Sequence, residues 1–360
     1  MARKVWEVPL ELVHNKIPRY PGGREIDRFR GLKDCQDDGK PEAWVGSTTR
    51  AAGIHKDRDL GLSEVILPSE DVILLKDLID KYPKQLLGEK HFKRYGQELC
   101  ILVKLLDAKN QLGLQTHPTR EYAKAHFDSD FGKTESWYII GLREDQEERP
   151  YVLLGFKEGV TREIFEGLYD NEDIKSMEEW CHKIHVSPGD MFLVDAGVPH
   201  AVGPGCFLVE VQESSDITVG ARKREFPTEA EELAYKNRLL GCYIYDGSSY
   251  GENLEKYKIP PVINRTDQGG TEKVLLGRTN TSYFGITESE VRGEFPMENT
   301  GTFSIAIVLE GEGEIVYSGG TMDIRKGSEV FLPAGIQDAI LKSENNTTLK
   351  VVQAFPPEII

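Results

Sequence analysis

Few cysteines and no long apolar runs are present in this chain of 360 residues. The five cysteines are odd in number and form no CxxC pair, which excludes a zinc-finger pattern and a disulfide framework and is typical of reduced thiols in a cytoplasm. No stretch approaches the length of a membrane span, and the first residues lack the apolar core of a signal peptide. We therefore expect a cytoplasmic protein with no membrane partner.

Acidic residues outnumber basic ones, so the formal net charge is −16. Such a surface does not suit nucleic acid or an anionic membrane, so neither is expected as a partner. A local cluster of Lys or Arg could still bind a small anionic substrate. The 39% hydrophobic and 29% charged residues describe a globular protein, and the length allows two domains with buried cores.

An internal repeat indicates how the chain is organised. Residues 186–201 align without a gap with residues 324–339. The matched positions are Gly189 and Gly327, Ala196 and Ala334, and Gly197 and Gly335. A repeat of this length indicates two copies of one β unit.

The remaining pattern predicts a mainly β protein with helices in its N-terminal part. Residues 161–182 predict a helical insert, whereas short strands and Gly-rich turns dominate from residue 258 onward. Residues 243–257 are polar and turn-rich, and we interpret them as a linker. The sequence thus predicts an N-terminal domain over residues 1–242 and a C-terminal domain over residues 258–360.

The repeated segment resembles the second sequence motif of cupins. In that motif a Gly is followed after five residues by Pro-x-Gly, and after two further residues by a His. The first copy has Asp195 at the Pro position and keeps His200, while the second keeps Pro333 and has Asp338 instead of the His. This resemblance implies two cupin-like jelly-roll barrels. The first would carry metal ligands and the second would lack them.

Four side chains suited to metal binding occur in the N-terminal part. Gln115 and His117 are two residues apart, so in a strand they point to the same face, and Glu135 and His200 can complete the set. Two imidazoles, a carboxylate and an amide oxygen suit one divalent metal, Zn²⁺ above all, and would also accept manganese, iron or cobalt. Each residue also has a plain structural interpretation, as a hydrogen-bonded histidine or a strand carboxylate. The motifs around His117 and His200 favour the metal.

Several short motifs resemble those of type I mannose-6-phosphate isomerases and occur in the same order. They are Lys104–Ala108, Leu114–Pro118, Gly132–Tyr138, Ala196–Ala201 and Val209–Asp216, with Arg19–Gly23 and Glu42–Trp44 as N-terminal landmarks. The resemblance runs from about residue 19 to residue 240, and the C-terminal barrel matches only in type. It implies a metal held by Gln115, His117, Glu135 and His200.

The resemblance also implies a reaction, the interconversion of mannose 6-phosphate and fructose 6-phosphate. A proton moves between C1 and C2 through an enediol, so the site needs an acid–base group and a cation that polarises the sugar oxygens. Glu210 maps onto an acidic residue near the reacting carbons, although an ordinary strand carboxylate is equally compatible. Lys104 and Lys133 map onto basic pocket residues. Because a lone cation in an apolar strand is costly, Lys104 is expected to have a partner or a ligand.

Three positions depart from the family pattern: Gly113 replaces a Ser, Gly220 replaces an Arg, and Thr48 or Thr49 replaces a His. These departures concern recognition of the phosphate more than the metal. They leave open an isomerase of a different or unphosphorylated sugar, a cupin metalloenzyme of another class such as an iron-dependent oxygenase, and a non-catalytic sugar-binding cupin.

A basic segment after Gly220 could supply the missing guanidinium. Arg222, Lys223 and Arg224 lie close enough in sequence, or they form only a solvated basic turn. We place Arg222 with Lys133 among the catalytic and substrate-binding residues, together with Glu210 and Lys104.

Overall fold

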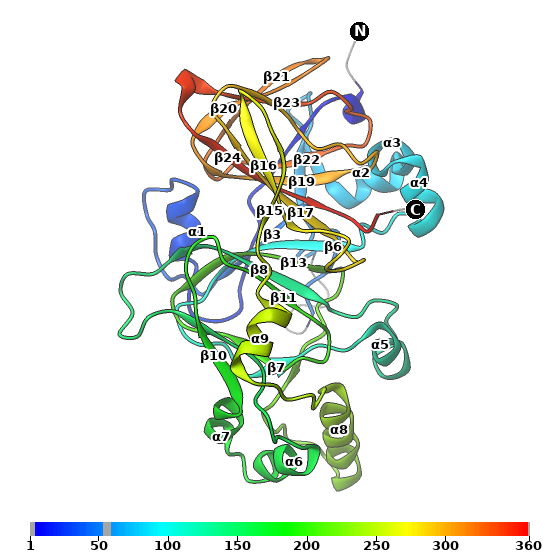
Figure 1. Ribbon diagram of the computed structural model, residues 1–360. Coiled ribbons are helices and arrows are strands. Elements are labelled where there is room, and N and C mark those ends of the chain that lie inside the picture. The colour runs from blue at the N-terminus through cyan, green and yellow to red at the C-terminus, as the bar shows by residue number, and fades with distance from the viewer. Residues whose placement is uncertain (1–3, 53–58, 359–360) are drawn as a thin grey trace. The chain divides into compact units, whose positions relative to one another are not determined.

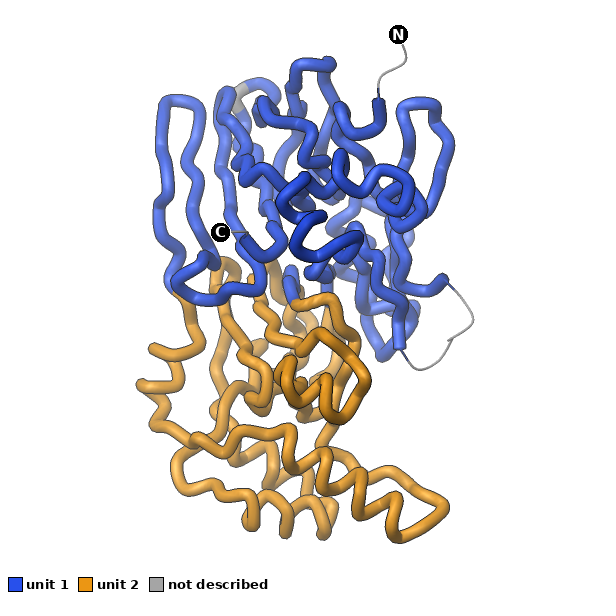
Figure 2. The backbone as a smooth tube through the Cα atoms, turned by 90° about the vertical axis from the view of Figure 1, so that its right-hand side faces the viewer, with its two compact units in different colours: residues 1–106, 209–212, 260–360 blue, residues 107–208, 213–259 orange. Residues whose placement is uncertain are grey.

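The computed structural model describes residues 4–52 and 59–358, and the chain divides into two compact units (Figure 1). Unit 1 contains residues 1–106, 209–212 and 260–360, and unit 2 contains residues 107–208 and 213–259 (Figure 2). The predicted domain boundaries at residues 242 and 258 stay a prediction. Strand β13 (Cys206–Glu213) contributes residues to both units.

Unit 1 is built on two antiparallel sheets. The larger has the strand order β15-β16-β17-β24-β19-β22-β1-β4-β5, and the smaller has the order β18-β23-β20-β21. The bounds in the larger sheet are β15 Val262–Thr266, β16 Gly270–Leu276, β17 Gly285–Val291, β24 Leu349–Phe355, β19 Ser304–Glu310, β22 Glu329–Leu332, β1 Leu10–Leu12, β4 Glu64–Ile66 and β5 Val72–Leu74. Those in the smaller sheet are β18 Glu294–Pro296, β23 Ile340–Ser343, β20 Glu312–Tyr317 and β21 Gly320–Arg325.

The core of this unit forms where the two sheets face each other. Val308 and Val330 from the larger sheet pack in one buried cluster with Ile315 and Leu341 from the smaller. In the smaller sheet, buried and less buried residues alternate along the strands, because successive side chains point to opposite faces, whereas β19 and β22 of the larger sheet are buried along most of their length. The result is the sandwich of a small jelly roll.

The N-terminal part of unit 1 completes the larger sheet and adds short helices. Strand β1 pairs with β22, and a buried ion pair 2.5 Å long joins Arg30 to Glu329. Strands β2 (Lys16–Ile17), β3 (Glu42–Val45) and β6 (Ile101–Asp107) pair in that order. The helices are α1 Arg24–Phe29, α2 Leu75–Lys81, α3 Pro83–Leu87 and α4 Glu89–Tyr95, and the 3₁₀ turns are Val5–Glu7 and Glu344–Asn346.

Unit 2 combines a sheet of order β10-β9-β12-β7-β14 with the antiparallel pair β8 and β11. The strand bounds are β7 Gln115–Thr116, β8 Glu135–Leu142, β9 Tyr151–Phe156, β10 Cys181–His185, β11 Met191–Val194, β12 His200–Val202 and β14 Val219–Gly220. The helices are α5 Arg120–His126, α6 Arg162–Asp170, α7 Ile174–Glu179, α8 Glu229–Cys242 and α9 Tyr250–Tyr257.

Helices α6 and α7 occupy the predicted insert at residues 161–182. The side chains of Thr161 and Asp173 cap them by accepting hydrogen bonds from backbone N–H groups. Phe165 of α6 and Met177 of α7 pack with residues of β9 and α8 in one buried cluster. The helical insert thus adds a second apolar layer to this unit.

The predicted repeat of one β unit is confirmed in detail. Strands β11 and β22 occupy matching positions of the two copies. The turn before each is closed in the same way, since Ser187 N donates to Asp190 Oδ2 and Arg325 N donates to Ser328 Oγ, each at 3.0 Å. Equal local structure from aligned residues is the signature of a duplicated unit.

Residues 243–257, interpreted from the sequence as a polar linker, contain helix α9. Ser249 and Glu252 form a capping box at its start, and Asn253 and Tyr257 are buried. The segment is polar because only one face of the helix packs against the rest of unit 2. Across the described residues, we find no helix with the length and apolarity needed to cross a bilayer.

Candidate metal centre

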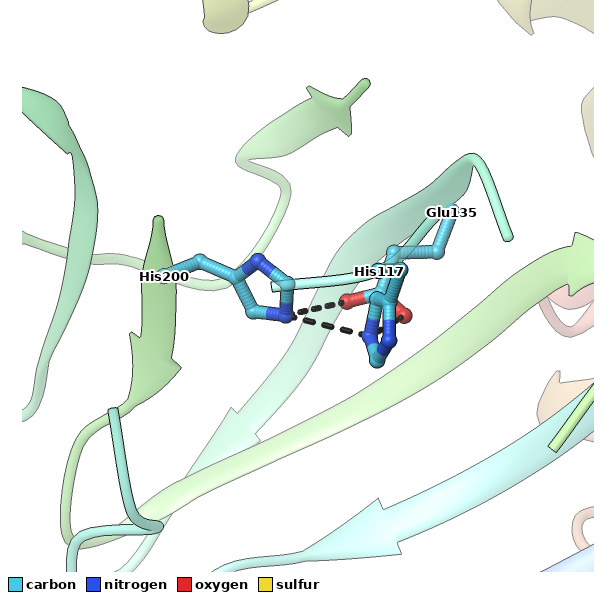
Figure 3. A group of neighbouring side chains, drawn as sticks. All are labelled: His117, Glu135 and His200. Carbon is cyan, nitrogen blue, oxygen red and sulfur yellow. Dashed lines mark hydrogen bonds and ion pairs between the residues drawn. The ribbon is translucent and has the colours of Figure 1, made fainter. Parts of the chain in front are cut away.

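The four predicted metal ligands lie at the ends of neighbouring strands of unit 2. Gln115 in β7 stands opposite His200 in β12, and Glu135 begins β8 opposite Val194 of β11. His117 follows β7 directly. Figure 3 shows the two imidazole rings and the carboxylate turned toward one another. Register brings Gln115 next to His200 within one sheet, whereas Glu135 comes from β8, which belongs to a different sheet.

The distances between the ligand atoms suit a single small cation. Nε2 of His117 lies 3.0 Å from Oε2 of Glu135, and Nε2 of His200 lies 3.4 Å from Oε1 of Glu135. The two Nε2 atoms are 3.2 Å apart. The side-chain nitrogen of Gln115, rather than its oxygen, lies 3.4 Å from His200 Nε2. All three atoms of the His117, Glu135 and His200 set lie within 4.8 Å of one another, with these residues buried.

Backbone carbonyls determine which ring nitrogen of each histidine faces the centre. His117 Nδ1 lies 2.9 Å from the carbonyl of Ile217, and His200 Nδ1 lies 2.9 Å from that of Val198. Each Nδ1–H therefore donates, so each Nε2 presents a lone pair. Two lone pairs and a carboxylate that face one another repel unless a positive charge lies among them, and either the Lys133 ammonium or a metal ion can supply that charge. The donor set thus fits a divalent metal ion, with outer hydrogen bonds of the kind that orient metal-binding histidines.

Lys133 brings positive charge to the same place. Its Nζ donates to His117 Nε2 and to Glu135 Oε2, both at 2.8 Å, and the side chain is buried. The ammonium thus uses the lone pairs that a metal would use. The predicted substrate-binding residue Lys133 is adjacent to the candidate ligands.

Burial and neighbouring charges determine the protonation of the centre. Burial, reinforced by the Lys133 ammonium, lowers the pKa of His117 to about 3, and burial also lowers the pKa of His200. Burial acts to raise the pKa of Glu135, but Lys133 and His117 hold that pKa well below its usual range. At neutral pH the centre therefore consists of two neutral imidazoles and a carboxylate, which are the forms that bind metals.

Lys104 and Glu210 form a second buried polar group, within unit 1. Lys104 Nζ lies 3.4 Å from Glu210 Oε2 and 3.9 Å from Glu42 Oε2, and all three side chains are largely buried. Lys104 Nζ also lies 5.3 Å from the ring centre of Trp44, whose Nε1 donates to Glu42 Oε2. The expected partner of Lys104 is thus present.

Glu42 was not identified as a functional candidate from the sequence. Its spacing from Trp44 carries a signal, because residues two apart in a strand share a face. In the register of β3 and β6, Trp44 stands opposite Lys104. A strand containing Glu-x-Trp beside a strand with a lone lysine could therefore have suggested the contact.

The basic residues proposed to replace the family Arg point elsewhere or lie in solvent. Arg222 is exposed, Lys223 Nζ donates to the carbonyl of Asp170, and Arg224 stacks over Tyr235. The role of Arg222 stays a prediction.

Gly220 lies beside the candidate ligands. In the register of β14 and β7 it stands opposite Gln115. A Cβ atom added at Gly220 would meet nothing within 4 Å, and the same is true at Gly113. The described residues therefore leave room for a Cβ atom at both of these positions where the chain departs from the family pattern.

Comparison with known proteins identifies the family. Residues 23–137 match the family described as phosphomannose isomerase type I, catalytic domain, and residues 278–351 match the mannose-6-phosphate isomerase cupin domain. Mannose-6-phosphate isomerase ManA of Bacillus subtilis is 30% identical over 261 residues, which cover 69% of this chain and 75% of that protein. The chain belongs to the mannose-6-phosphate isomerase family.

Further relatives agree with this assignment. The mannose-6-phosphate isomerase of Streptococcus mutans is 28% identical over 245 residues, 66% of this chain and 69% of that protein. A crystal structure of the Bacillus subtilis mannose 6-phosphate isomerase has a TM-score of 0.73 at 22% identity and covers 96% of this chain and 99% of that one. This likeness shows the fold, so the predicted mainly β, cupin-type architecture is confirmed.

Membership in this family also confirms the predicted enzyme type, an isomerase of the mannose-6-phosphate isomerase kind. The family match extends further than the sequence motifs suggested, because the C-terminal barrel matches the cupin domain of the same family rather than cupins in general.

Proposed function

We propose that this protein is a metal-dependent isomerase that interconverts mannose 6-phosphate and fructose 6-phosphate through an enediol. The observation that carries the proposal is the buried set of His117, Glu135 and His200, whose Nε2 lone pairs and carboxylate face one another. The names of the family relatives support the choice of substrate. The substrate is a small sugar phosphate, and neither nucleic acid nor a membrane is a partner.

The proposed metal ligands are Gln115, His117, Glu135 and His200, and the proposed metal is Zn²⁺. Mixed nitrogen and oxygen donors with neutral imidazoles favour that ion. When bound, a divalent ion supplies a positive charge that polarises the oxygens on C1 and C2 of the sugar. The metal would use the lone pairs of His117 Nε2 and Glu135 Oε2, which otherwise accept hydrogen bonds from Lys133 Nζ at 2.8 Å. Metal binding would therefore free this ammonium for a substrate oxygen.

Glu210 is the proposed acid–base group that moves the proton between C1 and C2. Its carboxylate lies 3.4 Å from the ammonium of Lys104, which holds it in place by charge attraction. Lys104 is itself positioned by Glu42 and the face of Trp44. Lys104, Lys133 and Arg222 are the proposed cations for the anionic substrate.

A second candidate substrate is an unphosphorylated or different sugar. The open space at Gly220, beside Gln115, favours it, because a site without the family guanidinium has less positive charge for a phosphate. The chemistry of proton transfer would be the same. For an unphosphorylated sugar, only the group at C6 differs.

One experiment tests the proposal. The purified protein is analysed for bound metal, and formation of ketose from mannose 6-phosphate and from free mannose is followed before and after chelation. We expect conversion of at least one sugar, lost with a chelator and restored by Zn²⁺. A protein that retains metal and converts neither sugar contradicts the isomerase assignment.

A cytoplasmic location is part of the proposal, and the five free cysteines support it. Fractionation of cells that produce the protein tests it, and recovery outside the cytoplasm contradicts it.

A further inference from the structure

The two chain segments that carry His117 and Glu135 pack directly against each other. Lys133 N donates to the carbonyl of Pro118 at 3.0 Å. At Gly132, a Cβ atom would lie 2.7 Å from the carbonyl oxygen of Pro118 and 2.8 Å from the backbone nitrogen of Arg120. No side chain fits there, so the backbones touch. The separation of the two ligands therefore depends on how firmly these segments are held together.

Glu213 forms two hydrogen bonds with the segment that carries Glu135. Its backbone N–H donates to the carbonyl of Thr134 at 3.1 Å, and its Oε1 accepts from Thr134 N at 3.1 Å. Thr134 stands between Lys133 and Glu135, the two residues whose side chains reach the candidate metal centre. The side chain of Glu213 is only 1% exposed, so these bonds are shielded from water.

The other carboxylate oxygen of Glu213 holds the segment that carries His117. Arg120 Nε donates to Glu213 Oε2 at 2.5 Å. Arg120 follows His117 by three residues and begins helix α5, whose cap is the side chain of Thr119. One carboxylate thus joins both ligand-bearing segments, one through a backbone N–H and the other through a guanidinium.

From this geometry, we infer that Glu213 and Arg120 are positioning residues that fix the distance between His117 and Glu135 in the metal centre. The inference rests on the proposed function, since it assigns these residues to the same metal. A buried carboxylate is costly unless it is paired, and here both of its oxygens have directed partners. Ligands held by such outer contacts bind a metal more tightly because less ordering is needed on binding.

The test measures zinc affinity rather than activity. Wild-type protein, Glu213→Ala, Glu213→Gln and Arg120→Gln compete with a zinc-binding dye for Zn²⁺, and thermal unfolding of each metal-free protein is recorded. Loss of an outer-contact residue lowers metal affinity about 10- to 100-fold, which we expect for Glu213→Ala. We expect Glu213→Gln to weaken zinc binding less than Glu213→Ala but by at least threefold, as in Arg120→Gln, because its amide oxygen still accepts from Thr134 N whereas its NH₂ group cannot accept from Arg120.

A matched control lies in the same helix as Arg120. Lys124 and Asp130 form an ion pair whose side chains are 76% and 81% exposed. Lys124→Ala should leave zinc affinity unchanged, because an exposed pair contributes little.

Each outcome is decisive. Folded Glu213→Ala with wild-type zinc affinity and a lower unfolding temperature overturns the inference, since Glu213 would then support only the fold. If Glu213→Ala does not fold, Arg120→Gln decides: its side chain is 34% exposed, so the variant should fold, and at least threefold weaker binding is expected. Unchanged affinity in that variant overturns the inference. Wild-type protein that binds no zinc overturns the proposed metal centre and this inference with it.

Discussion

The two copies of the repeat, residues 186–201 and 324–339, have the same local backbone but different chemistry. His200 in the first copy is matched by the exposed Asp338 in the second. Glu135 stands opposite Val194, and the equivalent position opposite Leu332 is Ser304. Apart from His117, Glu135 and His200, the described chain contains no other group of three or more His, Cys, Asp or Glu side chains close enough to share an ion.

Neutral hydrogen bonds replace the candidate ligands in the second copy. Gln353 donates to Ser304 Oγ at 2.8 Å and to the carbonyl of Glu298 at 3.0 Å, and both Gln353 and Ser304 are buried. These groups satisfy one another without a cation. The comparison teaches that the β unit does not need a metal to fold, and that a few positions at strand ends decide whether it can bind one.

The largest effect is expected when the first copy receives the residue of the second. His200→Asp should lose the metal, and kcat/KM for the sugar substrate should fall about 10³-fold or more, because a metal contributes several kcal/mol to transition-state stabilisation. Metal content and kinetics check this. The matched variant Asp338→Ala should leave both unchanged. Full activity in His200→Asp would contradict the difference between the copies.

A second prediction concerns a position where the second copy has a charged residue and the first copy has an apolar one. Glu329 in β22 is matched by Met191 in β11, and it is buried with Arg30. Arg30→Ala should lower the free energy of unfolding by about 3–5 kcal/mol, because it leaves a buried carboxylate unpaired. Urea unfolding measures this loss.

The double variant Arg30→Met with Glu329→Met makes the second copy more like the first. It should recover most of the lost stability, since apolar packing can replace a buried ion pair. A double variant as unstable as Arg30→Ala would show that packing, rather than the unpaired charge, causes the loss.

The third prediction sharpens the comparison with the family relatives. Gly220→Arg adds a guanidinium to the residue that stands opposite Gln115 in the pairing of β14 with β7. An added Cβ atom at this position meets no described atom within 4 Å. A charge-assisted bond contributes about 1.5–3 kcal/mol, so kcat/KM for mannose 6-phosphate should rise roughly 10- to 100-fold. Free mannose is the control substrate and should gain little. An equal gain in kcat/KM for both sugars would show that an arginine at this position does not act through the phosphate.

The smallest effect is a pH dependence in unit 1. Burial lowers the pKa of His91, whose Nε2 lies 2.7 Å from the carbonyl of Glu98 and whose Nδ1 has no hydrogen-bond partner among the described residues. Because the folded pKa is depressed, the folded ring stays neutral while the unfolded chain gains a proton below about pH 6.5. This contribution to stability is therefore present above pH 6.5 and is lost as the pH falls toward the folded pKa.

Urea unfolding at pH 7.5 and 5.5 tests the role of His91. His91→Gln should reduce the loss of stability on acidification, whereas a change at the exposed His126 should not alter it. An unchanged pH dependence in His91→Gln would assign the loss to other groups.

The features that could be predicted from the sequence are local. The gap-free repeat identified β11 and β22, and Thr161 marked the start of α6. His117 and His200 stood in recognisable motifs. In each case neighbours in sequence determine the structure, through alternation, capping or turn formation.

The features that could not be predicted depend on distant segments. Glu42 contacts Lys104 through the pairing of β3 with β6, and Arg120 reaches Glu213 across 93 positions of sequence. The helix at residues 250–257 has a readable capping box, but which face it buries depends on packing. Sequence patterns show what a side chain can do, and register determines which partner it meets.

Metal stoichiometry tests the central claim most directly. Wild-type protein and Glu135→Ala are purified in parallel, dialysed without chelator and analysed for zinc by elemental mass spectrometry. We predict one bound divalent ion per wild-type chain and almost none in Glu135→Ala, with both proteins folded by circular dichroism. Equal metal content in the two proteins, or none in the wild type, would contradict the assignment of the metal to His117, Glu135 and His200.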